Sequence, residues 1–461
     1  MRLAVLLAAA LAAPILSAPA AAQSPTFEDH PLLHQLAAEV SPDAERATDT
    51  KLVGFGTRHT LSDTRSNTRG IGAARRWVAA QFAEYAKACG GCLTIETPSE
   101  TFTGSRIPKP TEVVDVLAIQ PGTSDPERVV VISGHLDSRV SDAMNATSDA
   151  PGANDDGSGT SAVIEAARVL SKHRFPATIV YAALSGEEQG LYGGHVLAGY
   201  AAAHGWRVEA DLNNDIVGNT EGTTGLRDDT HVRVFSEGTR TTETAAEADK
   251  RRYNGGEVDS PSRNLARFMD RLADHYLTNL DVEMVYRTDR FGRGGDQVEM
   301  LKAGYPAVRV TEAVENYNRQ HQDLRVENGV RYGDVIEGVD FPYLAKVTRL
   351  NVVSMAALAM APAPPTGVTI EGAVTPDTTL KWKPSAGAAG YRVWWRGTTD
   401  PQWQAATSRR AAGPTEVLKG INIDNYFFGV SAISADGWES PVVFPGPAGT
   451  FEREPPQKAG G

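Results

Sequence analysis

The sequence has only two cysteines, fewer basic than acidic residues, and no long hydrophobic run after its first residues. Lys and Arg number 45 against 57 Asp and Glu, which gives a formal net charge of -12. This balance leaves no basic face for nucleic acid, so a nucleic-acid partner is not expected. The apolar runs are too short to cross a bilayer, so no membrane span is expected either.

The two cysteines are Cys89 and Cys92, in the sequence Cys-Gly-Gly-Cys. A redox-active pair is one interpretation, but no thioredoxin-like pattern surrounds it. A zinc knuckle would need a second pair of cysteines. We therefore predict a tight disulfide, which implies an oxidising compartment.

The first residues indicate how the chain reaches such a compartment. Met1-Arg2 precedes the apolar run Leu3-Ala4-Val5-Leu6-Leu7, and Ala20-Ala21-Ala22 offers a cleavage site of small residues. This pattern is typical of a secretory signal peptide over residues 1–22. The mature protein is therefore expected to be exported, to the periplasm or the extracellular space.

The length of 461 residues leaves room for two domains, and the composition changes near residue 361. Short alternating apolar runs after that point predict an all-β sandwich. Trp382, Tyr391 and Tyr426 stand where a fibronectin type III module has its core aromatic residues, and this stretch resembles one. The predicted segments are a signal peptide (1–22), an enzyme domain (23–360), a Pro-rich linker (361–365), a fibronectin type III-like domain (366–452) and a tail (453–461).

The main chemical signal is the stretch Gly152-Ala153-Asn154-Asp155-Asp156-Gly157-Ser158-Gly159, which precedes an amphipathic helix. Its glycines allow the backbone to turn tightly. Open α/β folds bind ligands at the carboxyl ends of their strands, where such a turn is expected. We interpret Asp155 as a carboxylate shared by two metal ions. The alternative is an Asx turn that caps the helix.

A second candidate follows the apolar run 129–133, which is typical of a strand covered on both faces. This run leads into His135 and, two residues later, Asp137. A histidine with a nearby carboxylate suits a metal ligand that the carboxylate orients. The alternative is a core histidine whose hydrogen bonds are satisfied.

Further carboxylates follow other strands. Glu187 and Glu188 come directly after the apolar strand predicted at 178–184, so one can bind metal while the other carries a proton. Asp215 has apolar neighbours, which suggests that it is buried. Burying a carboxylate costs free energy unless a nearby cation compensates its charge. His321 lies in a loop after another predicted strand. Adjacent acidic residues on a solvated face are the alternative interpretation.

Together these residues resemble the secreted di-zinc aminopeptidases of metallopeptidase family twenty-eight, over residues 45–355. The resemblance implies an α/β fold with a mostly parallel, mixed central sheet and helices on both faces. The family often has Tyr immediately before its last histidine, where this chain has Gln320. The motifs that carry the resemblance are His135-Leu136-Asp137, the 152–159 stretch, Gly186-Glu187-Glu188-Gln189-Gly190, Asn214-Asp215 and His321.

The resemblance also implies a role for each residue and two Zn²⁺ ions per chain. Glu187 would be the general base, and Asp137, whose carboxylate is expected to orient His135, is predicted as the second catalytic residue. The substrates would be peptides or proteins with a free N-terminus. The five metal ligands would be Asp155 between the ions, His135 and Asp215 at one ion, and Glu188 and His321 at the other.

Three alternatives stay open. A carboxypeptidase or dipeptidase can use the same fold, because the sequence does not show which end of the substrate is held. A glutaminyl cyclase resembles this family but works with one zinc. An exported binding protein without metals is the non-enzymatic alternative. The sequence predicts neither the preferred side chain nor the oligomeric state.

Overall fold

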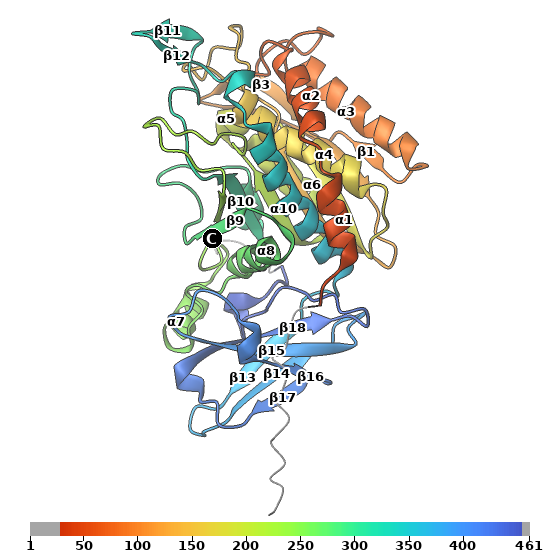
Figure 1. Cartoon of the computed structure of the whole chain (residues 1–461), viewed down its shortest axis with the longest axis vertical. Coiled ribbons are helices and arrows are strands. Elements are labelled where there is room, and N and C mark those ends of the chain that lie inside the picture. Colours follow the sequence, from red (N-terminus) through yellow and green to blue (C-terminus); the bar gives the residue numbers. More distant parts are fainter. Residues whose placement is uncertain (1–27, 454–461) are drawn as a thin grey trace, which may run out of the picture.

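The computed structural model describes residues 28–453. The predicted signal peptide, 1–22, and nearly all of the predicted tail lie outside the described residues. The described part contains a large α/β unit followed by two small β-sheets, which lie below it in Figure 1. None of the helices within 28–453 is long and apolar enough to span a bilayer.

An eight-stranded mixed sheet forms the centre of the α/β unit. Four neighbouring pairs are parallel (β6–β5, β5–β7, β7–β10 and β8–β9), and three are antiparallel (β1–β4, β4–β6 and β10–β8). This confirms the predicted fold class. In spatial order the strands are β1 (Thr94–Glu96), β4 (Val116–Gln120), β6 (Ala177–Leu184), β5 (Asp125–His135), β7 (Arg207–Asn214), β10 (Ala307–Glu312), β8 (His231–Phe235) and β9 (Asp281–Val285).

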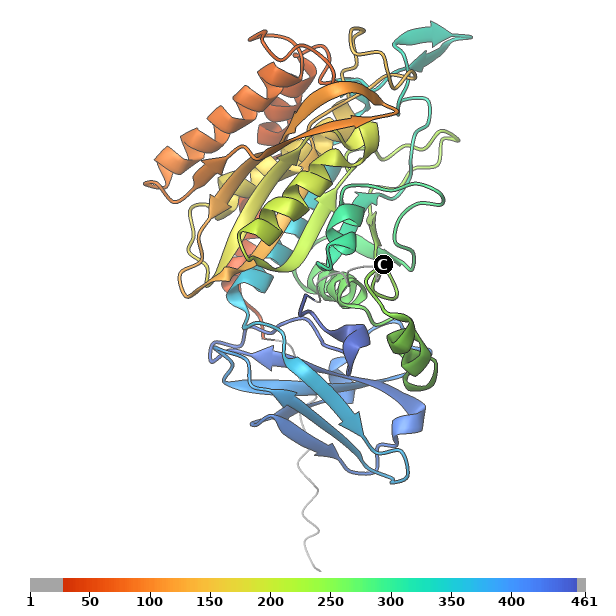
Figure 2. The ribbon, with the colours of Figure 1, turned by 180° about the vertical axis from the view of Figure 1, so that it is seen from behind.

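Helices cover both faces of this sheet, as predicted. In β5, Val130 and Ile132 belong to one buried cluster and Val129 and Val131 to another, because successive side chains of a strand point to opposite faces. Figure 2 shows the α6 side of the sheet. The first cluster includes residues of α3 (Ile71–Ala88), α4 (Gly159–Leu170), α8 (Pro261–Tyr276) and α10 (Phe341–Met360), and the second includes residues of α6 (Tyr192–Ala203) and α9 (Gln297–Lys302).

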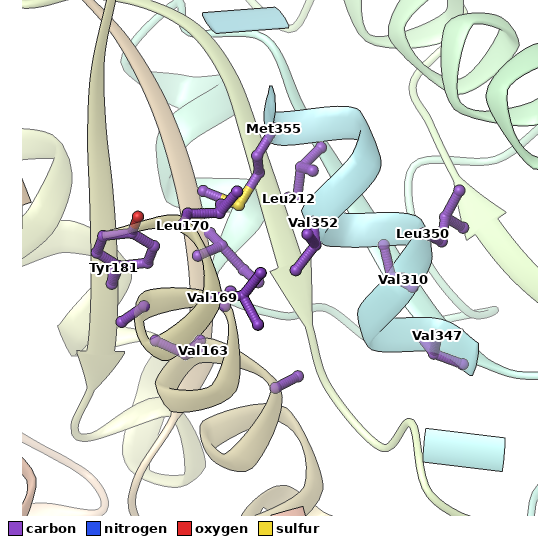
Figure 3. Close-up of a cluster of buried hydrophobic side chains, with 14 of the residues drawn as sticks. Val163, Val169, Leu170, Tyr181, Leu212, Val310, Val347, Leu350, Val352 and Met355 are labelled. Atoms are coloured by element: carbon purple, nitrogen blue, oxygen red, sulfur yellow. The ribbon is translucent and has the colours of Figure 1, made fainter. Parts of the chain in front are cut away.

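The packing of α4 and α10 on the sheet fixes the position of the 152–159 stretch. Val163 and Leu170 of α4 meet Leu212 of the sheet and Val352 and Met355 of α10 (Figure 3). All five are fully buried. Burial of one such side chain contributes about 1.5–3 kcal/mol, so α4 and the turn before it are held firmly against the sheet.

The remaining elements of the α/β unit lie around this core. Two hairpins, β2–β3 and β11–β12, pair outside the main sheet. Figure 1 shows β11–β12 projecting at the top and α7 lying near the C-terminal sheets. These elements are α1 (Pro31–Glu39), α2 (Pro42–Val53), β2 (Ser99–Gly104), β3 (Ile107–Val114), α5 (Glu187–Gly190), α7 (Ala245–Asn254), β11 (Arg325–Glu327) and β12 (Val330–Tyr332).

The two cysteines lie between α3 and β1. Cys89 follows the last residue of α3, and Cys92 precedes β1. The two residues form a disulfide, as predicted from the sequence.

The C-terminal region forms two three-stranded antiparallel sheets. A buried cluster between them includes Trp382, Tyr391 and Val430. Trp394 and Trp403 are also buried, at 0% and 3% exposure, so they pack inside the protein. The sheets are β13 (Thr366–Glu371), β14 (Thr378–Lys383) and β17 (Thr415–Leu418), and β16 (Ser408–Ala411), β15 (Gly390–Gly397) and β18 (Tyr426–Ile433).

A buried polar network joins the C-terminal sheets to the α/β unit. The Asp259 carboxylate accepts hydrogen bonds from Arg267 of α8 at 2.9 Å and from Arg396 of β15 at 2.6 Å. Trp403 Nε1 donates to Asn264 Oδ1 of α8 at 2.9 Å. Arg267 and Arg396 are 1% and 2% exposed, so Asp259 provides charge compensation that water cannot replace.

We expect Asp259→Ala to lower the free energy of unfolding by about 3–5 kcal/mol, because it leaves two buried guanidinium groups without their carboxylate. Chemical denaturation of the full chain measures this change. The matched control is Glu371→Ala, which removes a pair with Lys381 that is 49% and 63% exposed and is expected to change stability by about 1 kcal/mol or less. Equal effects of the two variants would contradict the importance of this network.

Candidate metal centre

Asp155 lies in a tight turn directly before α4. Gly152 has a φ of +53°, and a Cβ there would lie 2.5 Å from a neighbouring side chain, so glycine is needed. The Asp334 carboxylate accepts the backbone N–H groups of Asn154 and Asp155, at 2.9 and 2.7 Å. The peptide bond between Asp155 and Asp156 is cis. These contacts hold the Asp155 carboxylate in one place.

The structure brings all five predicted metal ligands together. His135 Nε2 lies 3.1 Å from Asp155 Oδ1 and 3.8 Å from Asp215 Oδ1. His321 Nε2 lies 2.9 Å from Asp155 Oδ2 and 3.2 Å from Glu188 Oε1. Asp155 therefore belongs to two groups of three ligand atoms, with one carboxylate oxygen facing each group. In each group the three atoms lie within 4.8 Å of one another.

The topology of the sheet explains this convergence. His135 is the last residue of β5, Asp215 follows β7, and Glu188 lies in the short α5 that follows β6. These three strands are parallel neighbours, so their carboxyl ends meet at one edge of the sheet. His321 comes from the loop after β10 and has a φ of +53°. Residues far apart in the sequence thus reach a single site.

The chemistry of the five side chains fits zinc. Imidazole nitrogens and carboxylate oxygens, without thiolate, are the donor set of catalytic zinc sites. Glu188 Oε1 is buried and makes no hydrogen bond among the described residues, although His321 Nε2 lies 3.2 Å from it. A buried carboxylate oxygen without a hydrogen bond is costly unless a cation binds it.

Nearby cationic groups favour the ionised forms of Asp155 and Asp215. Burial favours the neutral form of Asp155, but His321 and His135 together outweigh it and hold the pKa of Asp155 well below its usual range. At Asp215, burial is likewise outweighed by Arg309, His135 and Arg290 together, which lower the pKa. Burial opposes the charged form of His321, yet the charge on Glu188 contributes to raising its pKa to about 10. The site therefore strongly favours positive charge.

Glu187 lines the same site but belongs to neither group of ligand atoms. Burial raises the pKa of Glu187 to about 8, with the charge on Glu188 adding to the effect and His135 opposing it. A carboxyl group that lies beside the ligands, and is free of them, can accept and release a proton.

Asp137 contacts His135 through its backbone carbonyl group as well as through the carboxylate that the sequence predicts. His135 Nδ1 lies 3.0 Å from the backbone carbonyl oxygen of Asp137 and 3.6 Å from its carboxylate. The carboxylate also accepts the backbone N–H groups of Glu187 and Glu188, each at 3.2 Å, and the Thr60 hydroxyl at 2.8 Å. Asp137 thus positions both glutamates, and its carbonyl group orients the histidine.

Two arginines that the sequence does not predict as site residues contact the side chains of the candidate metal ligands. Arg139 Nε donates to Glu188 Oε2 at 2.7 Å, and its Nη2 lies 2.6 Å from His321 Nδ1. Arg309 Nη1 donates to Asp215 Oδ2 at 2.5 Å, which leaves Oδ1 facing His135. The sequence predicts the strand that contains Arg309. It does not show which side chain of a neighbouring strand Arg309 contacts.

A cleft of about 590 Å³ opens onto the ligand groups. Asp155, Glu187 and His321 are among its lining residues. Its walls also carry four guanidinium groups, those of Arg106, Arg139, Arg290 and Arg293. The cleft can therefore admit a peptide-sized ligand, and its guanidinium groups could bind a carboxylate of that ligand.

Comparisons with known proteins agree with this chemistry. Residues 115–328 match the profile of Peptidase family M28. The chain is 47% identical over 413 residues to a protein of Leptosphaeria maculans described as a "Probable zinc metalloprotease", with 89% of this chain and 95% of that protein covered. A protein of Pyricularia oryzae with the same description is 43% identical over 420 residues, with 89% and 83% covered.

Solved structures share the fold at lower identity. The LapA aminopeptidase of Legionella pneumophila has a TM-score of 0.52 and 18% identity, with 77% of this chain and 80% of that chain covered. LapB of the same organism has a TM-score of 0.51 and 17% identity, with 73% and 76% covered. At these identities the likeness concerns the fold of the α/β unit.

Proposed function

This chain belongs to peptidase family M28 and is a zinc metalloprotease, and we propose that it is an aminopeptidase that binds two Zn²⁺ ions. The observation that carries the proposal is Asp155, whose two carboxylate oxygens face two separate groups of ligand atoms. The fold shared with the LapA aminopeptidase supports exopeptidase action. Asp155 would bridge the ions, with His135 and Asp215 at one and Glu188 and His321 at the other.

The reaction would be hydrolysis of the first peptide bond. Bound zinc supplies Lewis acidity, which activates water as a nucleophile and polarises a carbonyl group. Glu187 would accept the proton of the attacking water as its oxygen bonds to the carbonyl carbon. It would then give that proton to the leaving amine as the carbon–nitrogen bond breaks.

The local structure suits Glu187 to this role. The Asp137 carboxylate holds the backbone N–H groups of Glu187 and Glu188. This contact fixes two adjacent glutamates so that Glu188 contributes to a ligand group while Glu187 lines the cleft beside it. The positive charge of bound cations would favour the ionised form of Glu187, which is the form that a general base needs.

A second candidate is a carboxypeptidase or dipeptidase. The observation that favours it is the set of arginines on the cleft walls, because guanidinium groups bind carboxylates, including the C-terminal carboxylate of a peptide. A glutaminyl cyclase remains the single-zinc alternative, which metal content separates from the other two.

A panel of matched peptides tests the proposal. Peptides with free ends, with an acetylated N-terminus and with an amidated C-terminus would be incubated with the enzyme, with and without a chelator. We expect cleavage of the free and amidated peptides, no cleavage of the acetylated set, and no activity with chelator. Cleavage that needs a free C-terminus and ignores acetylation would instead establish the carboxypeptidase.

We also propose that the protein is exported to the periplasm or the extracellular space. The signal-like sequence at 1–22 supports this, and so does the disulfide between Cys89 and Cys92. We propose further that residues 366–452 are a fibronectin type III-like module. The two antiparallel sheets around Trp382 support that assignment.

A further inference from the structure

We propose that the cleft selects substrates with a carboxylate close to the scissile bond, and that Arg290 and Arg293 bind this carboxylate with help from Arg106. The inference rests on the peptidase function proposed for the same cleft. It adds the substrate class, which is peptides whose terminal residue is acidic. The carboxylate could belong to a Glu or Asp side chain or to the C-terminus of a short peptide.

Arg290 is the strongest evidence for a carboxylate site. Its side chain lines the cleft but is only 9% exposed. Its Nε bonds to Asp289 at 3.2 Å, and its Nη2 donates to the Gly294 carbonyl at 3.4 Å. Its Nη1 is buried and makes no hydrogen bond within residues 28–453, and the nearest carboxylate, Glu315, is 3.7 Å away. A buried guanidinium nitrogen of this kind is a donor without an acceptor.

The position of Arg290 places this donor beside the metal ligands. Arg290 Nη2 lies 3.9 Å from Asp215 Oδ2. A carboxylate bound at Arg290 would therefore lie next to the reacting bond. Arg290 would then recognise a carboxylate on the residue that contributes to the scissile bond. Arg290 would therefore help to determine which substrates the enzyme cleaves.

Arg293 and Arg106 add exposed donors to the cleft. Arg293 is three residues from Arg290, and its Nη1 bonds to Glu315 at 3.1 Å. Arg106 is at the tip of the β2–β3 hairpin, where its Nη1 donates to the Glu188 carbonyl at 2.8 Å. Each contact orients the guanidinium group and uses one of its five N–H donors, which leaves others for a ligand.

Arg290 and Arg293 are not fully paired with carboxylates of the protein, so a purely structural role does not explain both guanidinium groups. Glu315 is the carboxylate closest to both Arg290 Nη1 and Arg293, and it is already paired with Arg233 at 2.8 Å. Asp289 faces Arg290 and also lies 3.6 Å from Arg309. Asp289 and Glu315 are therefore each shared between more than one guanidinium group, which leaves N–H donors on Arg290 and Arg293 that a substrate carboxylate would accept.

The test compares matched peptides on the zinc-loaded full chain. One set has a C-terminal amide and begins with Glu, Gln, Leu or Lys. A second set has a neutral first residue and a free or amidated C-terminus. We expect kcat/KM to be at least about tenfold higher for Glu than for Gln, mainly through KM, because a charged hydrogen-bonded pair replaces a neutral one. The second set shows whether the C-terminal carboxylate is the group recognised.

The variant for the test is Arg293→Gln, combined with Arg106→Gln. Both side chains are exposed, so the fold should tolerate the change. We expect the ratio of kcat/KM for the Glu peptide to kcat/KM for the Gln peptide to fall to about twofold or less. The matched control is Arg287→Gln, which removes the same charge from the same loop but does not line the cleft. It should keep the preference.

A binding measurement separates this inference from the proposed function. Calorimetry with glutarate as the probe should show binding to the wild type and at least about tenfold weaker binding to the double variant. If no peptide is cleaved but glutarate binds in this way, the carboxylate site stands and the aminopeptidase proposal fails. The carboxylate site would be overturned if the Glu and Gln peptides were cleaved equally and the free and amidated C-termini were also cleaved equally. A preference that survives in the double variant would overturn it too.

Discussion

Glu187→Gln is expected to lower kcat by about 10²–10⁴-fold while the protein keeps its zinc. The amide keeps the size of the side chain but cannot accept the proton of the attacking water. Glu187 belongs to neither ligand group, so the metal content should not change. Steady-state kinetics and elemental analysis of the same purified sample measure the two quantities together.

The control for this variant is Glu84→Gln, which makes the same chemical change on the exposed surface of α3. It should keep both activity and zinc. Retained turnover in zinc-loaded Glu187→Gln would remove Glu187 from the role of general base. Loss of zinc in the same variant would assign it to the ligand set instead.

Asp155→Ala is expected to reduce the zinc content from two per chain to less than one, and to abolish activity. The substitution removes a ligand atom from both groups at once, because Asp155 faces His135 with Oδ1 and His321 with Oδ2. Loss of an outer-shell partner alone costs about 10–100-fold in metal affinity, so loss of a shared ligand should cost more. Elemental analysis after dialysis against a buffered zinc concentration measures the effect.

Asp149→Ala is the matched control for Asp155→Ala. Asp149 lies in the loop before the same turn, and its side chain is 60% exposed. The control should keep two zinc ions. If Asp155→Ala also kept two zinc ions, the carboxylate would not be shared between them.

The candidate ligands could be predicted from the sequence because each lies at a recognisable local feature. His135 and Glu188 follow apolar strands, and Asp155 lies in a glycine-rich turn before a helix. Parallel strands bring such ends together at one edge, so an α/β pattern implies proximity. The fold class could be predicted for the same reason, because periodicity and strand-to-helix alternation are local signals.

The contacts that could not be predicted from the sequence join residues that lie far apart along the chain. Arg309 contacts Asp215 across 94 positions of the sequence, and Arg139 contacts His321 across 182. An arginine has no local pattern that reveals such a partner. The contact between His135 Nδ1 and the Asp137 backbone carbonyl group could not be predicted, because a sequence does not show which oxygen of Asp137 lies closer to His135. Asp259, which links the two parts of the chain, also has no local signature.

The most direct test of the central claim is anomalous diffraction from crystals of the zinc-loaded protein, recorded above and below the zinc absorption edge. We expect two zinc peaks per chain, one on each side of the Asp155 carboxylate. One peak would lie beside His135 and Asp215, and the other beside Glu188 and His321. A single peak, or zinc bound away from Asp155, would contradict the central claim.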